Sequence, residues 1–149
     1  MIVALPLHIL AIVVWLGGLF CMSVMVSPAG RDLDATAIAF HWQRVLARFF
    51  TWAWIALLLI VATGIALVQY RFGGFSHMPA LHRANTAIGV PAIALFVYVF
   101  LIPWQRYRRS IVKSEWSLAG RILGHVRIVL AAILVLGIAA SVVSIADRL

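Results

Sequence analysis

The chain has 149 residues, of which 65% are hydrophobic and only 11% are charged. A soluble domain would be about 45–50% apolar and about 25% charged, so this composition excludes a water-soluble globular protein. It predicts an integral membrane protein with one domain, residues 1–149. We attribute the net charge of +8 to arginines that hold loops on the cytoplasmic side, and we expect no nucleic-acid partner.

Four runs of residues are apolar and long enough to cross a bilayer, which takes about 20 residues. They are residues 2–26, 49–70, 84–104 and 122–146. Asp34 can cap the start of a helix, and residues 35–48 then form an amphipathic lead-in to the second span. No alternation typical of a β-barrel is present. The sequence therefore predicts an all-α fold, an integral membrane four-helix bundle.

Proline, glycine and polar residues mark the connections between these spans. The first span ends at residues 27–30 and the second ends near Gly73. Pro79 suits the first turn of the third helix, whereas Pro91 removes a donor inside that helix and predicts a kink. Residues 105–120 form a polar, basic stretch that we expect to be a loop.

Lys and Arg are concentrated in two of the connections, which lie between spans one and two and between spans three and four. By the positive-inside rule these connections lie in the cytoplasm. The sequence thus predicts a multi-pass protein of a bacterial-type inner membrane with both termini outside. The basic residues are Arg31, Arg44, Arg48, Arg106, Arg108, Arg109 and Lys113.

His8 is an ionisable residue inside the first span, and such residues are costly in lipid and usually functional. His82 opens the third span and lies toward the same, outer face. Two imidazoles from facing helices can ligate a haem iron, and Arg71 and Arg83 at that face can pair with haem propionates. The competing interpretation is that His8 hydrogen-bonds a neighbouring helix while His82 lies in the membrane interface.

A second pair of histidines, His41 and His125, lies toward the inner face. Arg44 and Arg48 follow His41 at helical spacing, and Arg121 precedes His125 by one turn. These residues suggest a second haem site in which the arginines hold propionates. The competing interpretation is a solvated or lipid-headgroup face.

Copper is the alternative metal, because thiolate and thioether groups select Cu(I). Cys21, Met22 and Met25 lie close together in the first span, and His77 and Met78 lie in the outer connection. In an apolar helix such residues more often serve packing.

Acid-base chemistry has little support in this sequence. The chain has only four carboxylates, all outside the spans, and no glycine-rich loop that would cradle a phosphate. The sequence therefore disfavours a hydrolase and an ATP-driven pump. If the protein is an enzyme, we expect a membrane oxidoreductase. The carboxylates are Asp32, Asp34, Glu115 and Asp147.

Several short motifs in this chain resemble those of CopD-like copper-resistance membrane proteins. They are Leu7-His8-Ile9-Leu10, Trp15-Leu16-Gly17-Gly18-Leu19-Phe20, Ser27-Pro28-Ala29, Arg48-Phe49-Phe50, Thr63-Gly64 and Leu81-His82. The pattern is also similar to HemJ-type protoporphyrinogen oxidases, a group associated with b-type haem, in which histidines recur at the positions of His8 and His82. This chain departs from that group at Ala84, where a lysine is expected. It departs again at residues 125–127, which replace an Asn-Glu-Val-Pro stretch.

The sequence and these resemblances together favour an inner-membrane protein that binds haem b through His8 and His82. Its expected role is electron transfer, with a quinone or a respiratory-chain protein as partner. The alternatives are copper uptake or tolerance, a porphyrinogen-type oxidase, and an accessory subunit of a membrane complex. Homo-oligomers are compatible with each of these.

Overall fold

The computed structural model describes residues 3–25 and 34–146. Its elements, in chain order, are α1 (Ala4–Phe20), the π-helical turn η1 (Cys21–Met25), α2 (Ala35–Phe72), the 3-10 turn η2 (Phe75–His77), α3 (Ala80–Leu101), α4 (Pro103–Val112) and α5 (Trp116–Ala146). Within the described residues, four helical stretches are long and apolar enough to cross a membrane: Ala4–Val24, Ala35–Phe72, Ala80–Val112 and Trp116–Ser144. The prediction of an all-α, four-helix membrane bundle is confirmed.

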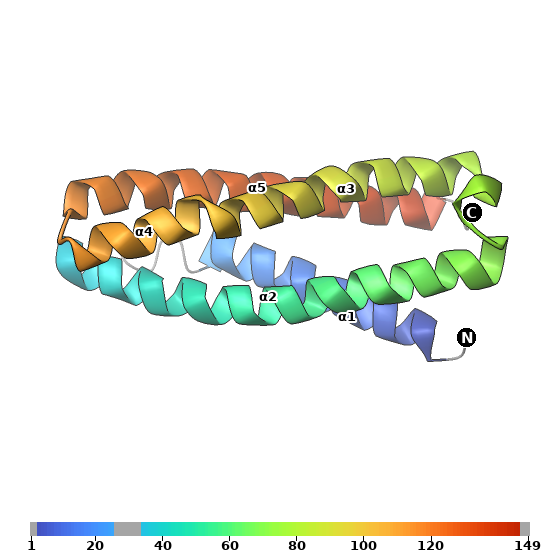
Figure 1. Ribbon diagram of the computed structural model, residues 1–149, viewed down its shortest axis with the longest axis horizontal. Helices are drawn as coiled ribbons and strands as arrows, with labels where there is room; N and C mark the ends of the chain where they lie inside the picture. The colour runs from blue at the N-terminus through green and yellow to red at the C-terminus, as the bar shows by residue number, and fades with distance from the viewer. Residues whose placement is uncertain (1–2, 26–33, 147–149) are drawn as a thin grey trace.

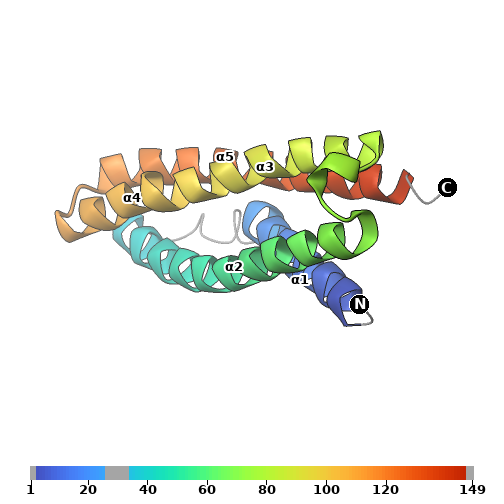
Figure 2. The ribbon, with the colours of Figure 1, turned by 45° about the vertical axis from the view of Figure 1, so that its right-hand side comes forward.

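The helices form two layers along one common axis (Figures 1 and 2). In one layer α1 packs on α2, and in the other α3 and α4 follow one another along α5. The beginnings of α1 and α3 lie at the same end of the bundle as the ends of α2 and α5. We call this the terminal end. The opposite end, where α2 begins and α4 meets α5, is called the basic end.

The second helix begins and ends at the residues that the sequence marks. The Asp34 carboxylate accepts a hydrogen bond of 2.7 Å from the backbone N–H of Ala37, and Gly73 ends the helix in the left-handed conformation (φ 68°). The amphipathic lead-in is continuous with the second span, giving one helix of 38 residues. At 1.5 Å per residue it is about 57 Å long, so it outreaches a hydrocarbon core of about 30 Å.

The prediction of a basic loop over residues 105–120 is wrong for most of that range. Only residues 113–115 separate α4 from α5. Pro103 ends α3 at Leu101 because it cannot donate a helical hydrogen bond, and its fixed φ then suits the first turn of a new helix. The chain therefore stays helical through its most basic segment.

Burial of one side of α4 explains why this segment is helical. Trp104, Tyr107 and Ile111 are spaced three and four residues apart and are all buried, while the arginines lie on the opposite side. The Tyr107 hydroxyl donates a hydrogen bond of 2.8 Å to the carbonyl of Ala39 on α2. This contact ties the two layers together at the basic end.

Pro91 lies inside α3 as predicted, whereas Pro79 differs slightly from its predicted place. Pro79 is the N-cap residue, one position before the first turn, and helical structure continues through Pro91. Pro91 is exposed, so its ring faces the surroundings of the bundle and not a neighbouring helix. Residues 27–30, the predicted end of the first span, lie outside the described residues.

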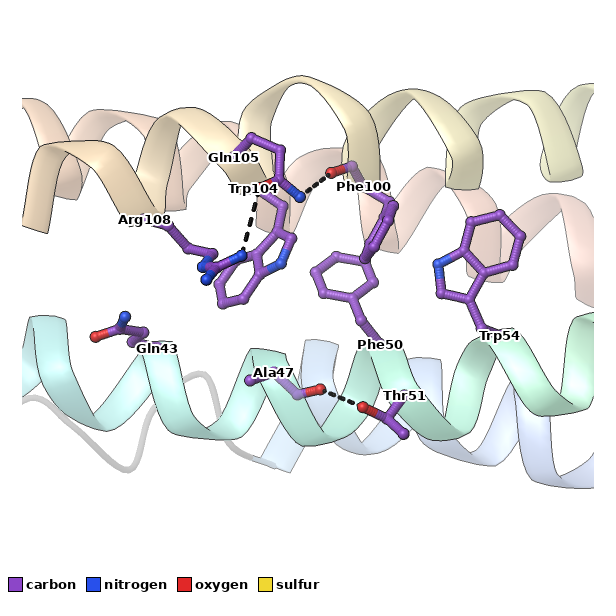
Figure 3. Close-up of a pocket in the computed structure, with 9 residues that line it drawn as sticks. All are labelled: Gln43, Ala47, Phe50, Thr51, Trp54, Phe100, Trp104, Gln105 and Arg108. Carbon is purple, nitrogen blue, oxygen red and sulfur yellow. Dashed lines mark hydrogen bonds between the residues drawn. The ribbon is translucent and has the colours of Figure 1, made fainter.

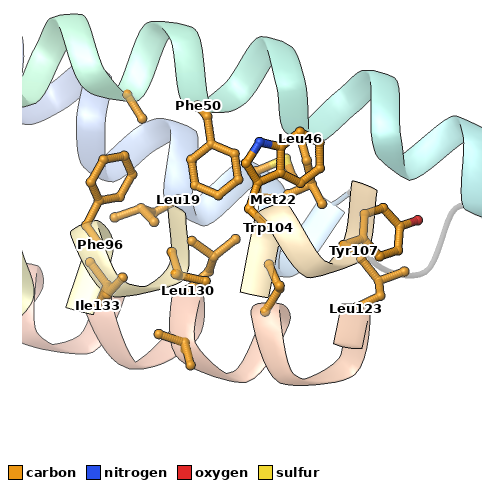
Figure 4. Packing of buried hydrophobic residues seen from close by; sticks show 14 of the residues in the cluster. Leu19, Met22, Leu46, Phe50, Phe96, Trp104, Tyr107, Leu123, Leu130 and Ile133 are labelled. Carbon is orange, nitrogen blue, oxygen red and sulfur yellow. The ribbon is translucent and has the colours of Figure 1, made fainter. Parts of the chain in front are cut away.

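An aromatic cluster forms the centre of the core (Figure 4). The Phe50 ring lies 5.8 Å from that of Phe96 and 5.4 Å from those of Phe100 and Trp104. The buried cluster comprises residues from 15–22, 39–57, 92–99, 104–111 and 119–134. It therefore fills the middle and the basic end of the bundle and does not extend to the terminal end, where α1 and α3 begin.

Candidate functional site

His8 lies at the terminal end of the bundle, on the inward side of α1. It precedes the buried residues Ala11 and Trp15 by three and seven positions, and it is itself half-buried. Its Nδ1 atom lies 2.7 Å from the Thr63 hydroxyl on α2. Its Cε1 atom lies 3.4 Å from the place where a Cβ on Gly64 would lie. On α2, Thr63 therefore hydrogen-bonds the imidazole, and Gly64 has no side chain that would collide with it.

The hydrogen bonds of Thr63 determine which nitrogen of His8 carries the proton. The Thr63 hydroxyl donates to the carbonyl of Leu59, and the carbonyl of Ile60 lies 3.3 Å away. Because its one proton is used within α2, the Thr63 oxygen accepts the bond from His8. We therefore assign the proton of the neutral ring to Nδ1 and the lone pair to Nε2. The backbone carbonyl of Ile60 on α2 also contacts the imidazole.

The hydrogen bond to Thr63 confirms one part of the competing interpretation, that His8 bonds a neighbouring helix. This bond uses only one of the two ring nitrogens of the neutral imidazole. A histidine that ligates a metal usually donates its other N–H to a fixed acceptor. The observed bond is therefore compatible with both a structural role and a ligand role for His8.

His82 also lies on an inward side, that of α3. Asn85 and Gly89 follow it at positions that continue into the buried residues Ala92 and Phe96. The imidazole is half-buried, and the Phe72 ring lies edge-on to it with the centroids 4.8 Å apart. The end of α2 and the beginning of α3 are therefore joined by this ring contact.

His8 and His82 lie at the same end of the bundle but at different positions along its axis. His8 bonds Thr63, whereas His82 contacts Phe72, which lies nine residues further along the same helix. Nine residues of α-helix correspond to about 13 Å along the axis. Axial ligands of one iron must lie on opposite sides of the same atom. The structure therefore does not bring His8 and His82 together as an opposed pair.

Two arginines lie beside His82 at the terminal end. Arg71 is in the last turn of α2, next to Phe72, and Arg83 follows His82 directly. Both side chains are exposed, and neither forms an ion pair with another described residue. The predicted pairing of Arg71 and Arg83 with haem propionates stays a prediction.

His8 on α1 and Gly89 on α3 lie at matching distances from a contact that joins these two helices. The rings of Trp15 and Phe96 join the two helices at a centroid distance of 6.1 Å. Gly89 precedes Phe96 by seven residues, as His8 precedes Trp15, and a Cβ at Gly89 would meet nothing within 4 Å. Trp15 Nε1 and Asn85 Oδ1 are buried without a hydrogen-bond partner in the described part of the chain. Buried polar atoms normally have a hydrogen-bond partner, so these two atoms are exceptions that a bound group could explain.

The inner histidines have separate neighbours. His125 Nε2 forms a hydrogen bond of 3.2 Å with the Tyr98 hydroxyl on α3. His41 is exposed, and its ring lies 6.4 Å from that of Trp42 on its own helix. These contacts do not bring His41 and His125 together.

Among the described side chains, the soft ligands suggested for copper do not form one group. Cys21 is exposed, whereas its neighbour Met22 is 5% exposed and packs in the core. The π-helical turn over Cys21–Met25 also changes the spacing of the side chains, and the Met25 side chain lies outside the described part. His77 is exposed while Met78 is buried. The described residues contain no group of three or more His, Cys, Asp or Glu side chains that could hold a metal ion.

A groove of about 410 Å³ between α2 and the α3–α4 junction was not predicted from the sequence (Figure 3). Aromatic rings and polar side chains line it together: Gln43, Phe50, Thr51, Trp54, Phe100, Trp104, Gln105 and Arg108, with Ala47. The Arg108 guanidinium donates to Gln105 Oε1 at 3.5 Å and lies 6.0 Å from the Trp104 ring centroid. These contacts hold a cation over an aromatic ring at one end of the groove, opposite Gln43.

Comparison of the chain with protein-family models, with curated proteins and with solved structures gave no match. The resemblance to CopD-like and HemJ-type proteins therefore stays a prediction.

Proposed function

We propose that the protein binds one b-type haem at the terminal end of the bundle, with His8 as an iron ligand, and that it serves electron transfer within the membrane. The hydrogen bond between His8 and Thr63 carries this proposal. It orients the ring and leaves the Nε2 lone pair for a metal, which is the usual arrangement around a ligating histidine. A haem bound there would supply one-electron redox chemistry.

The packing around His8 fits a planar group. The buried cluster stops before this end of the bundle, and Gly89 leaves open space at the depth of the imidazole. Trp15 Nε1 is a buried donor and Asn85 Oδ1 a buried acceptor, both without partners among the described residues. A bound group with polar substituents would offset the cost of burying these two atoms.

We assign His82 a different role from the one that the sequence suggests. It lies about 13 Å from His8 along the axis, beside Arg71 and Arg83. We therefore propose that His82 and the two arginines bind the haem propionates, for which arginine is well suited. In this arrangement His8 alone supplies a protein ligand to the iron.

Copper uptake or tolerance is the second candidate function. A bare metal ion in a protein site is typically held by three or four side chains, and the described residues contain no group of three. A haem needs fewer protein ligands because the porphyrin supplies four nitrogens. This difference is why we favour haem.

We further propose that a lipid-soluble quinone occupies the groove of Figure 3 as the electron partner. A quinone headgroup is a planar ring with carbonyl acceptors, which suits stacking on Phe100 or Trp104 and a bond from Arg108. Trp54, at the other end of the groove, precedes Thr63 by nine residues, or about 13 Å of helix. The groove and the His8 site would thus lie on opposite sides of α2, about two to three turns apart along the helix.

The haem proposal is tested by expressing the protein with adequate haem and recording reduced-minus-oxidised and pyridine haemochrome spectra. We expect a Soret band in the wild type and its loss in His8→Ala. His82→Ala should keep the spectrum but release haem more readily, and His125→Ala should match the wild type. Stoichiometric copper without haem would instead support the copper function. An unchanged spectrum in His8→Ala would reject the ligand.

The quinone proposal is tested separately, by following haem reduction after addition of a short-chain quinol. We expect Arg108→Ala to slow the reduction severalfold. Arg109→Ala, one residue further and outside the groove, should leave the rate unchanged. Equal rates in all three proteins would reject the groove as the quinone site without affecting the haem assignment.

A further inference from the structure

A second groove, distinct from that of Figure 3, lies at the basic end between the α3–α4 junction and α5. Its volume is about 410 Å³. Charged, polar and apolar side chains line it together: Tyr98, Ile102, Pro103, Arg106, Leu118, Arg121, Ile122 and His125. We call it the arginine groove. The second haem site suggested by the sequence used Arg121 and His125, but no role considered above uses Arg106 or the apolar lining.

No described carboxylate neutralises the positive charge of the arginine groove. Arg106 comes from α4 and Arg121 from α5, and neither forms an ion pair with a described residue. The described carboxylates are those of Asp34, which caps α2, and Glu115, which forms no ion pair with another described residue. Two guanidinium groups at one groove without an acid favour an anion, and arginine binds phosphate with paired hydrogen bonds.

His125 adds a third polar group on the same side. Its Nε2 atom bonds the Tyr98 hydroxyl at 3.2 Å, and the two rings meet edge to face with centroids 6.2 Å apart. This contact holds the imidazole between α3 and α5. His125 follows Arg121 by four residues, so both side chains lie on one side of α5.

The apolar lining distinguishes a lipid from a free anion. Ile102 is 50% exposed at the break between α3 and α4, and Leu118 is half-buried at the beginning of α5. A free phosphate would gain nothing from these side chains, whereas an acyl chain would bury them. Basic pockets between membrane helices are typical sites for anionic lipid headgroups.

We infer that the arginine groove binds an anionic phospholipid, with the headgroup phosphate at Arg106 and Arg121 and an acyl chain along Ile102 and Leu118. This site is independent of the haem and quinone proposals, because it shares no residue with either. It would anchor the most basic segment of the chain to one leaflet of the membrane.

The experiment is native mass spectrometry of the protein taken from nanodiscs that contain equal amounts of phosphatidylglycerol and phosphatidylcholine. We expect the wild type to retain phosphatidylglycerol preferentially. The Arg106→Gln/Arg121→Gln variant should retain it at least tenfold less, because each charge-assisted hydrogen bond contributes about a factor of ten in affinity. Arg121→Gln alone should give an intermediate loss.

The matched control is Arg109→Gln/Lys113→Gln, which removes two positive charges from the same end but outside the groove. It should retain phosphatidylglycerol as the wild type does. An equal loss in the control would show a general surface-charge effect and overturn the site. Displacement of the lipid by millimolar inorganic phosphate would show a free-phosphate site and overturn the lipid assignment. Helical circular dichroism checks that each variant is folded.

Discussion

At the scale of single residues, Thr63 decides what His8 can do. A threonine inside a helix commonly donates to a carbonyl in the preceding turn, and the Thr63 hydroxyl does so to Leu59. Its oxygen is then an acceptor for His8 Nδ1 at 2.7 Å. One hydroxyl therefore orients the imidazole, selects its tautomer and satisfies a half-buried donor. The role of Thr63 in this network cannot be inferred from the residue type alone.

Replacing Thr63 by valine should weaken haem binding roughly 10- to 100-fold, because valine keeps the shape but removes the acceptor for His8. Thr63→Ser keeps the hydroxyl and should bind haem nearly as the wild type does. The measurement is a haem titration of each purified apoprotein, monitored at the Soret band. If valine and serine variants bind equally well, the hydrogen bond does not support a ligand.

At the scale of elements, close approach of α1 and α5 is possible because Gly137 has no side chain. A Cβ added at Gly137 would collide with the Leu16 side chain and approach the Trp15 ring. Gly120 lies on the same helix, but a Cβ there would meet nothing within 4 Å. Of these two glycines, only Gly137 lies at an interface where a side chain would collide.

Gly137→Leu should destabilise the folded protein by about 1–3 kcal/mol, the usual cost of overpacking an interface. Gly120→Leu should be neutral or slightly stabilising, because glycine is a poor residue inside a helix. Thermal unfolding in detergent, followed by intrinsic fluorescence, measures the difference between the two midpoints. Equal midpoints would show that α1 and α5 do not pack closely at Gly137.

At the scale of the whole molecule, charge is divided between the two ends. Most of the described Lys and Arg residues belong to the basic end, near α4 and the beginnings of α2 and α5, whereas Arg71 and Arg83 lie at the terminal end. The positive-inside rule then predicts that the basic end faces the cytoplasm. The haem site would face outside and the arginine groove the inner leaflet.

This orientation predicts the accessibility of two engineered thiols in a Cys21→Ser background. Ser76→Cys lies in the exposed turn between α2 and α3, and Ser114→Cys lies in the exposed turn between α4 and α5. A membrane-impermeant maleimide added to intact spheroplasts should label Ser76→Cys at once and Ser114→Cys only after lysis. The reverse pattern would invert the topology.

Helix α2 was predictable from local sequence patterns, whereas helix α4 was not. The apolar runs, the Asp34 cap and the stop at Gly73 are local features, so α2 could be placed almost to the residue. The helix over Pro103–Val112 was missed because its basic composition is typical of a loop. Its burial of Trp104 and Tyr107 depends on where α2 and α5 lie.

Hydropathy and charge act locally along the chain, so the sequence predicts four helices that can cross a membrane and singles out His8. The partners of His8, the position of His82 relative to it and the two grooves became visible only in the folded bundle. Depth and orientation depend on how helices pack against one another. Residues 55 positions apart, such as His8 and Thr63, meet only when that packing is complete.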